Sequence, residues 1–167
     1  MDKGQGMKNG VTDHRAYLLH AVRLSREHMI GGSGGPFGAV VVKDGRVIAE
    51  GWNQVTSSND PTAHAEIVAI RRAGAALNDF SLRGATIYSS CEPCPMCLAA
   101  IHWARLDAVY FANDRHQAAL AGFDDAFFFD ELARPAPERS LLAVHMPLNE
   151  ASEVFDHWLN NAGKIPY

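Results

Sequence analysis

The chain has 167 residues, 47% of them hydrophobic, and a formal net charge of −4 at neutral pH. This length suits a single domain over 1–167 with a sizeable core, and the negative charge argues against a general attraction to nucleic acid or an anionic membrane. Residues 1–10 are polar and contain glycine without an apolar run. We therefore expect them to be flexible, and not a signal peptide or a membrane anchor.

The first third of the chain predicts a helix followed by a β-hairpin. Residues 13–30 place apolar side chains at helical spacing, and the glycine-rich run over 31–35 ends the helix. This run lacks the Gly-Lys-Ser/Thr of a phosphate loop, so we interpret it as a turn. Residues 37–42 and 46–52 flank Asp44-Gly45, a dipeptide typical of two-residue hairpin turns.

The remainder predicts helices that alternate with strands. In chain order these are a helix over 63–76 capped by Asp60 or Thr62, a strand over 85–90, a helix that starts at Pro93 or Pro95, a strand over 107–112, helices over 115–121, 125–132 and 150–160, and a strand over 141–146. This alternation indicates an α/β protein, a three-layer α/β/α sandwich around a central mixed sheet.

Four residues between positions 61 and 97 are of the types that build a catalytic zinc site. His64, Cys94 and Cys97 offer one imidazole and two thiolates, and leave the fourth tetrahedral position for water. Glu66 follows the histidine by two residues and can move the protons of that water as a general acid and base. The spacing His-x-Glu followed by Pro-Cys-x-x-Cys is a zinc deaminase signature. The expected cofactor is one Zn²⁺ per subunit.

A second hypothesis is a structural zinc module without catalysis. Cys91 stands three residues before Cys94 and could close a four-ligand site with no open position, although such a site has no use for Glu66. A thioredoxin-like cysteine pair explains neither His64 nor Glu66. With two of three cysteines assigned to metal, a disulfide framework is not expected, and a reducing compartment, the cytoplasm, is favoured.

Further motifs extend over most of the chain. They are the runs 35–40, 59–66, 90–97 and 121–125, together with Asn53 and the final Tyr167. On these motifs the chain resembles the cytidine deaminase-like superfamily, and more closely its bacterial guanine deaminase branch. Many deaminases share the metal motifs, whereas Gly-Phe-Asp-Asp and a final tyrosine are characteristic of the guanine deaminase branch.

The resemblance implies a function and a set of site residues. The implied reaction is hydrolytic deamination of guanine to xanthine and ammonia, with water attacking C2 and Glu66 protonating a ring nitrogen. Asn53 and Asp125 would bind the purine, and Phe37 and Trp103 would line its pocket. The resemblance also implies a homodimer in which a swapped C-terminal segment, about 135–167, packs on the partner subunit and Tyr167 closes the partner's pocket.

Several deaminase substrates stay open at this point. A tRNA adenosine deaminase shares the motif from Asp60 to Glu66, but the acidic balance of the chain after Asp124 would repel an RNA backbone. A small purine base is therefore the expected partner, without nucleic acid or membrane. Cytosine, a related triazine and guanosine remain alternatives within the deaminase class.

Overall fold

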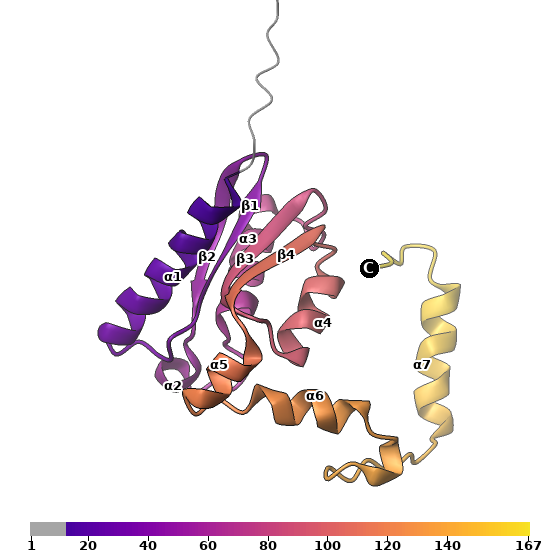
Figure 1. Ribbon diagram of the computed structural model, residues 1–167. Coiled ribbons are helices and arrows are strands. Elements are labelled where there is room, and N and C mark those ends of the chain that lie inside the picture. Colours follow the sequence, from indigo (N-terminus) through magenta and orange to yellow (C-terminus); the bar gives the residue numbers. More distant parts are fainter. Residues whose placement is uncertain (1–12) are drawn as a thin grey trace, which may run out of the picture.

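The computed structural model describes residues 13–167 (Figure 1). The expectation for residues 1–10 lies outside this range. The elements are α1 (His14–Ile30), β1 (Gly38–Lys43), β2 (Arg46–Trp52), α2 (Val55–Ser58), α3 (Ala65–Leu77), β3 (Ala85–Cys91), α4 (Pro95–Trp103), β4 (Ala108–Asn113), α5 (Arg115–Leu120), α6 (Asp125–Ala133), a 3₁₀ turn (Ala136–Glu138) and α7 (Asn149–Asn160). No helix within 13–167 is both long and apolar enough to cross a membrane.

The sheet is mixed, as the sequence predicted. Its strand order is β2-β1-β3-β4, with β1 antiparallel to both neighbours and β3 parallel to β4. The β1–β2 hairpin turns at Asp44 and Gly45, whose φ angles of 51° and 72° are those of a type I′ turn. The parallel pair needs a crossover, which α4 supplies.

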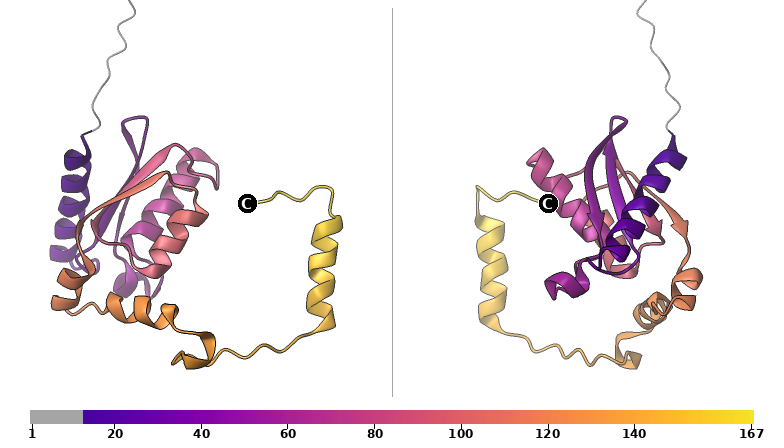
Figure 2. Two further views of the ribbon diagram at one scale, coloured as in Figure 1. Left: turned by 45° about the vertical axis from the view of Figure 1, so that its right-hand side comes forward. Right: turned by 90° about the vertical axis from the view of Figure 1, so that its left-hand side faces the viewer.

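Helices cover both faces of the sheet, so the predicted three-layer sandwich is confirmed (Figures 1 and 2). Alternate residues of β1 point to opposite faces. Ala39 and Val41 are buried in a core shared with α3 and α4, whereas Val40 and Val42 are buried with α1 and Tyr88. The first of these cores includes Ala65 of α3 and Ile101 of α4, the two helices that begin at the predicted ligands His64 and Cys94.

Two glycines let helices approach the sheet unusually closely, one on each face. A Cβ atom on Gly51 would lie 2.2 Å from the carbonyl oxygen of Ala65, in the first turn of α3. A Cβ on Gly38 would lie 2.3 Å from the carbonyl oxygen of Ala21 in α1. Gly51 therefore sets how near the start of α3 lies to β2.

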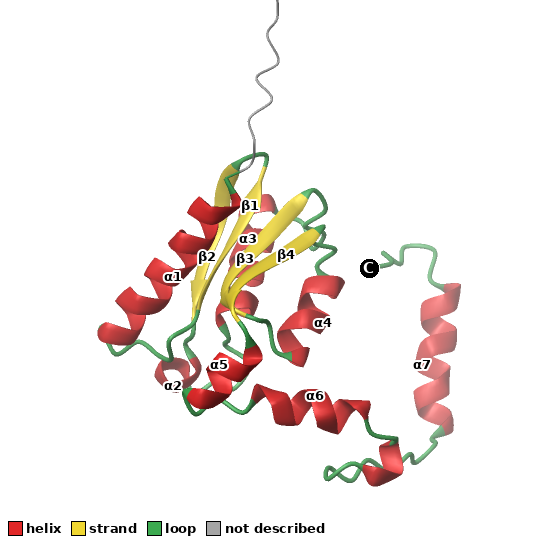
Figure 3. Ribbon diagram, in the orientation of Figure 1, coloured by secondary structure: helices red, strands yellow, loops and turns green. Residues whose placement is uncertain are grey.

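The C-terminal part of the chain extends away from this body. In Figure 2, α7 stands apart from the sheet in both views, and every residue of α7 is exposed. The strand predicted over 141–146 is wrong for the single chain: these residues have no regular structure (Figure 3). A strand needs a paired neighbour, and this segment passes no free sheet edge of its own chain.

Candidate active site

The predicted metal ligands lie at the starts of two helices. His64 is the N-cap residue of α3 and Cys94 that of α4, with Pro95 at the first helical position. Neither side chain caps its own helix. The predicted cap of α3 is wrong: Asp60 instead accepts hydrogen bonds from the backbone N–H (2.8 Å) and hydroxyl (2.7 Å) of Thr62, in a turn before the helix.

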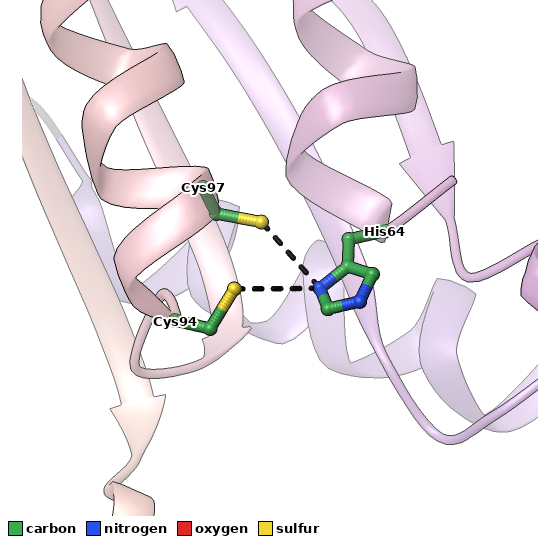
Figure 4. Close-up of side chains that lie close together, drawn as sticks. All are labelled: His64, Cys94 and Cys97. Atoms are coloured by element: carbon green, nitrogen blue, oxygen red, sulfur yellow. Dashed lines mark hydrogen bonds between the residues drawn. The ribbon is translucent and has the colours of Figure 1, made fainter. Parts of the chain in front are cut away.

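His64, Cys94 and Cys97 meet in a geometry that fits a zinc ion (Figure 4). The Nδ1 atom of His64 lies 3.6 Å from each sulfur, and the three ligand atoms all lie within 4.8 Å of one another. Tetrahedral zinc with ordinary Zn–N and Zn–S bonds separates its nitrogen and sulfur ligands by about 3.6 Å. The three side chains are thus preorganised to hold Zn²⁺ with a fourth position free.

The local electrostatics favour thiolate at this position. The Cys97 thiol hydrogen-bonds to Cys94 and, with His64, lowers the pKa of Cys94 to about 4. The same hydrogen bond raises the pKa of Cys97, since that thiol is the donor. The partial positive charge at the start of α4 also stabilises a thiolate.

Cys91 lies outside the ligand group. Its thiol donates to the carbonyl oxygen of Asp114 at 3.6 Å, and burial raises its pKa to about 11. The ligand atoms that lie within 4.8 Å of one another belong to His64, Cys94 and Cys97, and the Cys91 sulfur is not one of them. This geometry favours an open three-ligand site over the closed four-ligand alternative.

Glu66 is buried beside the ligands. Its Oε1 accepts a hydrogen bond from the Ser89 hydroxyl (2.7 Å), and its Oε2 lies 3.4 Å from the Cys97 sulfur. Burial raises the pKa of Glu66, and the Ser89 hydrogen bond offsets part of that rise. A carboxyl group in this environment is suited to taking up and returning a proton.

A cavity of about 470 Å³ opens next to these residues. Among residues 13–167, its lining comprises Gly34, Gly35, Phe37, Asn53, Val55, Thr56, His64, Glu66, Glu92, Cys94, Phe123 and Asp125. The structure thus gathers Phe37, Asn53 and Asp125 around the ligand group, although they are far apart in sequence. The lining combines an apolar surface with a few polar groups, as expected for a small-molecule site.

The amide of Asn53 has a defined orientation. Its Oδ1 accepts hydrogen bonds from the backbone N–H groups of Gly35 (3.2 Å) and Val55 (3.3 Å). The Nδ2 group is left to donate to a bound molecule. Asp125 begins α6 and is half-buried in the lining, and burial raises its pKa. The cavity thus presents one amide donor and one carboxylate acceptor.

Phe123 is a lining residue that the sequence analysis did not single out. Its ring meets that of Phe37 edge to face, with centroids 4.7 Å apart. It lies in the run 121–125, directly before the two aspartates. Two aromatic rings at right angles form an apolar corner of the cavity.

Trp103 and Tyr167 do not line this cavity in the single chain. Trp103 is 61% exposed at the end of α4 and Tyr167 is 73% exposed, and their rings lie 5.9 Å apart on the outer side of the body. Their assignment to a substrate pocket stays a prediction.

Residues 11–113 match the model of the cytidine and deoxycytidylate deaminase zinc-binding region. The chain belongs to this family of zinc deaminases. It is 51% identical to guanine deaminase from Bacillus subtilis over 155 residues, which cover 93% of this chain and 99% of that protein. The crystal structure of the same relative superimposes with a TM-score of 0.90 over the same shares of the two chains.

Two further relatives are more distant. A tRNA-specific adenosine deaminase from Agrobacterium fabrum is 43% identical over 103 residues, covering 62% of this chain and 68% of its own. The structure of guanine deaminase from Nitrosomonas europaea superimposes with a TM-score of 0.64 at 30% identity, covering 69% of this chain and 66% of its own. The B. subtilis relative is the one of the three that matches along nearly the full length.

Proposed function

We propose that this protein catalyses the hydrolytic deamination of guanine to xanthine and ammonia. The observation that carries the proposal is the shared cavity, which sets the His64-Cys94-Cys97 group and Glu66 beside the donor of Asn53 and the acceptor of Asp125. The near full-length similarity to a guanine deaminase supports the same substrate.

The residues of the chain have distinct parts in the reaction. His64, Cys94 and Cys97 would hold the ion, and zinc held there would make water nucleophilic at neutral pH by lowering its pKa to about 7. Glu66 takes one proton from the attacking water and passes it to a ring nitrogen, and then takes the second proton from the same oxygen and passes it to the amino group at C2. Ammonia leaves, and the carbon keeps the oxygen as the carbonyl of xanthine. Ser89 holds the Glu66 carboxylate in place throughout.

Substrate selection in this proposal follows from two polar groups of the cavity lining, Asn53 and Asp125. Asn53 donates to an acceptor of the purine, while Asp125 accepts from the N–H groups of the base. Adenine offers an acceptor where guanine offers N–H, so the half-buried Asp125 carboxylate would remain without a partner. Phe37 and Phe123 bury the remaining ring surface.

The active form in this proposal is a homodimer with exchanged C-terminal segments. One face of α7 carries Val154, Phe155, Trp158 and Leu159, which are 42–72% exposed in the single chain. Leaving such a face in water is unfavourable, so a second copy is its natural cover. In the same way the apolar segment 141–146 lacks a strand partner, while β4 is an edge strand. Tyr167 would then close the partner's cavity.

The rest of the assignment follows from the same chemistry. We treat 1–167 as one deaminase domain whose segment from about 135 onward belongs to the dimer contact. We assign the enzyme to the cytoplasm, since the free thiols of Cys91, Cys94 and Cys97 suit a reducing compartment. A role in purine metabolism follows from the proposed substrate.

The test is ammonia release by the zinc-loaded protein from guanine, guanosine, adenine, cytosine and a tRNA. We expect release from guanine, and its loss in Glu66→Ala with zinc content unchanged. Release from tRNA alone would overturn the proposal in favour of an RNA-editing deaminase. If no substrate released ammonia and Cys91→Ser lost its zinc, the protein would be a structural zinc module.

A further inference from the structure

Arg115, the first residue of α5, makes contacts that the deamination chemistry does not use. Its Nε lies 3.1 Å from both carboxylate oxygens of Glu92, and its backbone N–H donates to the same carboxylate at 3.0 Å. Glu92 stands two residues before the ligand Cys94 and lines the cavity. Arg115 is therefore fastened to the loop that begins the metal-binding helix.

The same side chain also reaches α6. The guanidinium carbon of Arg115 lies 3.8 Å from the ring centroid of Phe129, a cation–π contact. Phe129 follows Asp125 by four residues, so the two side chains share one face of α6. One arginine thus connects the metal loop to the helix that carries the carboxylate acceptor.

α6 packs on α5 and α4 but contributes no residue to the two core clusters. Phe127 and Phe128 are 44% and 53% exposed, and the helix turns only Asp125, Ala126 and Phe129 partly inward before Glu131. α6 also lies outside the sheet and its two cores (Figure 1). Beside this helix packing, the Glu92–Arg115–Phe129 contact links α6 through side chains to the loop that precedes Cys94.

Arg115 also affects the charge of the cavity wall. The lining within residues 13–167 contains the carboxyl groups of Glu66, Glu92 and Asp125 but no lysine or arginine. Without Arg115, a second unpaired carboxylate would face the region where Asp125 must accept hydrogen bonds. The bidentate pair keeps Glu92 turned toward α5.

We infer that Arg115 is a positioning residue, which sets Asp125 relative to the metal ligands by clamping Glu92 and Phe129 together. The inference rests on the proposed function, since it concerns where the purine is held. A small displacement of Asp125 would move the reacting carbon away from the attacking water, which costs rate steeply.

The first experiment follows hydrogen exchange of the α6 amides in the zinc-loaded full-length protein. We expect exchange at least tenfold faster in Arg115→Met and an intermediate increase in Arg115→Lys, which keeps the charge but loses the planar fork. Phe129→Leu, which leaves the Glu92 pair intact, should loosen α6 similarly. Arg23→Met, which removes a 3.7 Å pair with Glu27 on α1, is the matched control and should leave α6 unchanged.

The second experiment is a double-mutant cycle with Asp125→Asn on guanine turnover. Arg115→Met should lower kcat/KM at least tenfold with zinc content retained, and adding it to Asp125→Asn should cost less than about twofold more, because both changes remove the same interaction. Losses that multiply would overturn the inference, and so would unchanged α6 exchange in both Arg115→Met and Phe129→Leu. If the wild-type protein did not deaminate guanine, the proposed function would fail, while the exchange comparison would still decide whether Arg115 anchors α6.

Discussion

The hydrogen bonds of Asn53 fix which end of its side-chain amide faces the cavity. Two backbone N–H groups occupy its oxygen, so only the NH₂ group is available for a ligand. An asparagine in a less constrained loop could turn either way. This orientation makes Asn53 a donor and distinguishes it from Asp125, whose carboxylate in the same cavity lining can accept.

Replacing Asn53 with aspartate should therefore raise KM for guanine. The substitution keeps the size and the oxygen that binds Gly35 and Val55, but it puts an acceptor where the purine needs a donor. An unmatched buried polar group costs about 1–3 kcal/mol, roughly a five- to 150-fold loss in kcat/KM. Steady-state kinetics with zinc-saturated protein measure KM and kcat/KM for guanine. Asn78→Asp, at the C-cap of α3, is the control, and equal kinetics in both variants would contradict the assignment.

The metal ligands and Glu66 could be predicted from sequence because two short motifs, His64-x-Glu66 and Cys94-x-x-Cys97, match a known zinc signature. Each motif lies at a helix start, and the signature itself indicates that the two helices meet. Phe123 and the Arg115 clamp could not be predicted in this way. Their contacts join residues from separate elements, and nothing in a single motif shows which of them meet.

Gly51 and Gly38 make a matched pair on neighbouring strands. Gly51 admits the start of α3, which carries His64 and Glu66, whereas Gly38 admits α1 on the opposite face. A methyl group at either position collides with helix backbone, so the helix must move outward. A methyl group on Gly51 would displace α3 and its metal ligand, whereas one on Gly38 would displace only α1.

We expect Gly51→Ala to weaken zinc binding by at least tenfold, because His64 moves away from Cys94 and Cys97. Both Gly51→Ala and Gly38→Ala should lower the Tm, since overpacking typically costs about 1–3 kcal/mol. Competition with a chelator measures the zinc affinity. A similar loss of zinc affinity in Gly38→Ala would show that general destabilisation, and not the placement of His64, is responsible.

Glu131 ties the end of α6 to the segment that follows it. The backbone N–H and the hydroxyl of Ser140 both donate to its carboxylate, and these hydrogen bonds lower the pKa of Glu131. A lowered folded-state pKa means that the stabilisation is present above the unfolded-state value of about 4.3 and is lost as pH falls through the folded-state pKa.

The Ser140 amide resonance should therefore titrate with a midpoint below about 4.3, the ordinary glutamate pKa. An NMR pH titration of the labelled protein measures this midpoint. In Glu131→Gln the transition should disappear, because the amide side chain does not ionise in this range. A midpoint at or above the ordinary value would contradict the role given to these hydrogen bonds.

The regular elements of the body could be predicted from hydrophobic period and turn residues. The hairpin at Asp44-Gly45 and the helices that begin at His14 and Asp125 agree with prediction to within a residue or two. The segment 141–146 has the composition of a strand but lacks a neighbour in its own chain. Amino-acid composition shows that this segment could form a strand, but strand formation also requires a neighbouring strand with which it can hydrogen-bond.

The extended C-terminal segment allows a test of subunit exchange. One chain carries Glu66→Ala and the other lacks residues 165–167, so each should be inactive or weak alone while retaining zinc. If the tail closes the partner's cavity, refolding the two together at equal amounts should restore about a quarter of wild-type activity, since half of the dimers are mixed and each has one complete site.

The separately refolded chains are the controls for this mixture. A tail that closed its own chain's cavity would give no recovery, because no single chain in the mixture has both Glu66 and residues 165–167. Unchanged kinetics in the truncated chain would instead remove Tyr167 from the site altogether. Size-exclusion chromatography of the same samples reports whether dimers form.

Asp125 and Tyr167 both lie after residue 113, where the zinc-binding family region ends, whereas all three metal ligands lie within it. The sheet and its two cores are likewise complete before α5 begins. Substitutions after residue 113 therefore leave the metal ligands and the sheet unchanged, provided that Arg115 keeps its contact with Glu92. Substitutions after residue 113 can then change which substrate binds while the metal site stays the same. The same residues are the ones to redesign for the removal of an amino group from a different substrate.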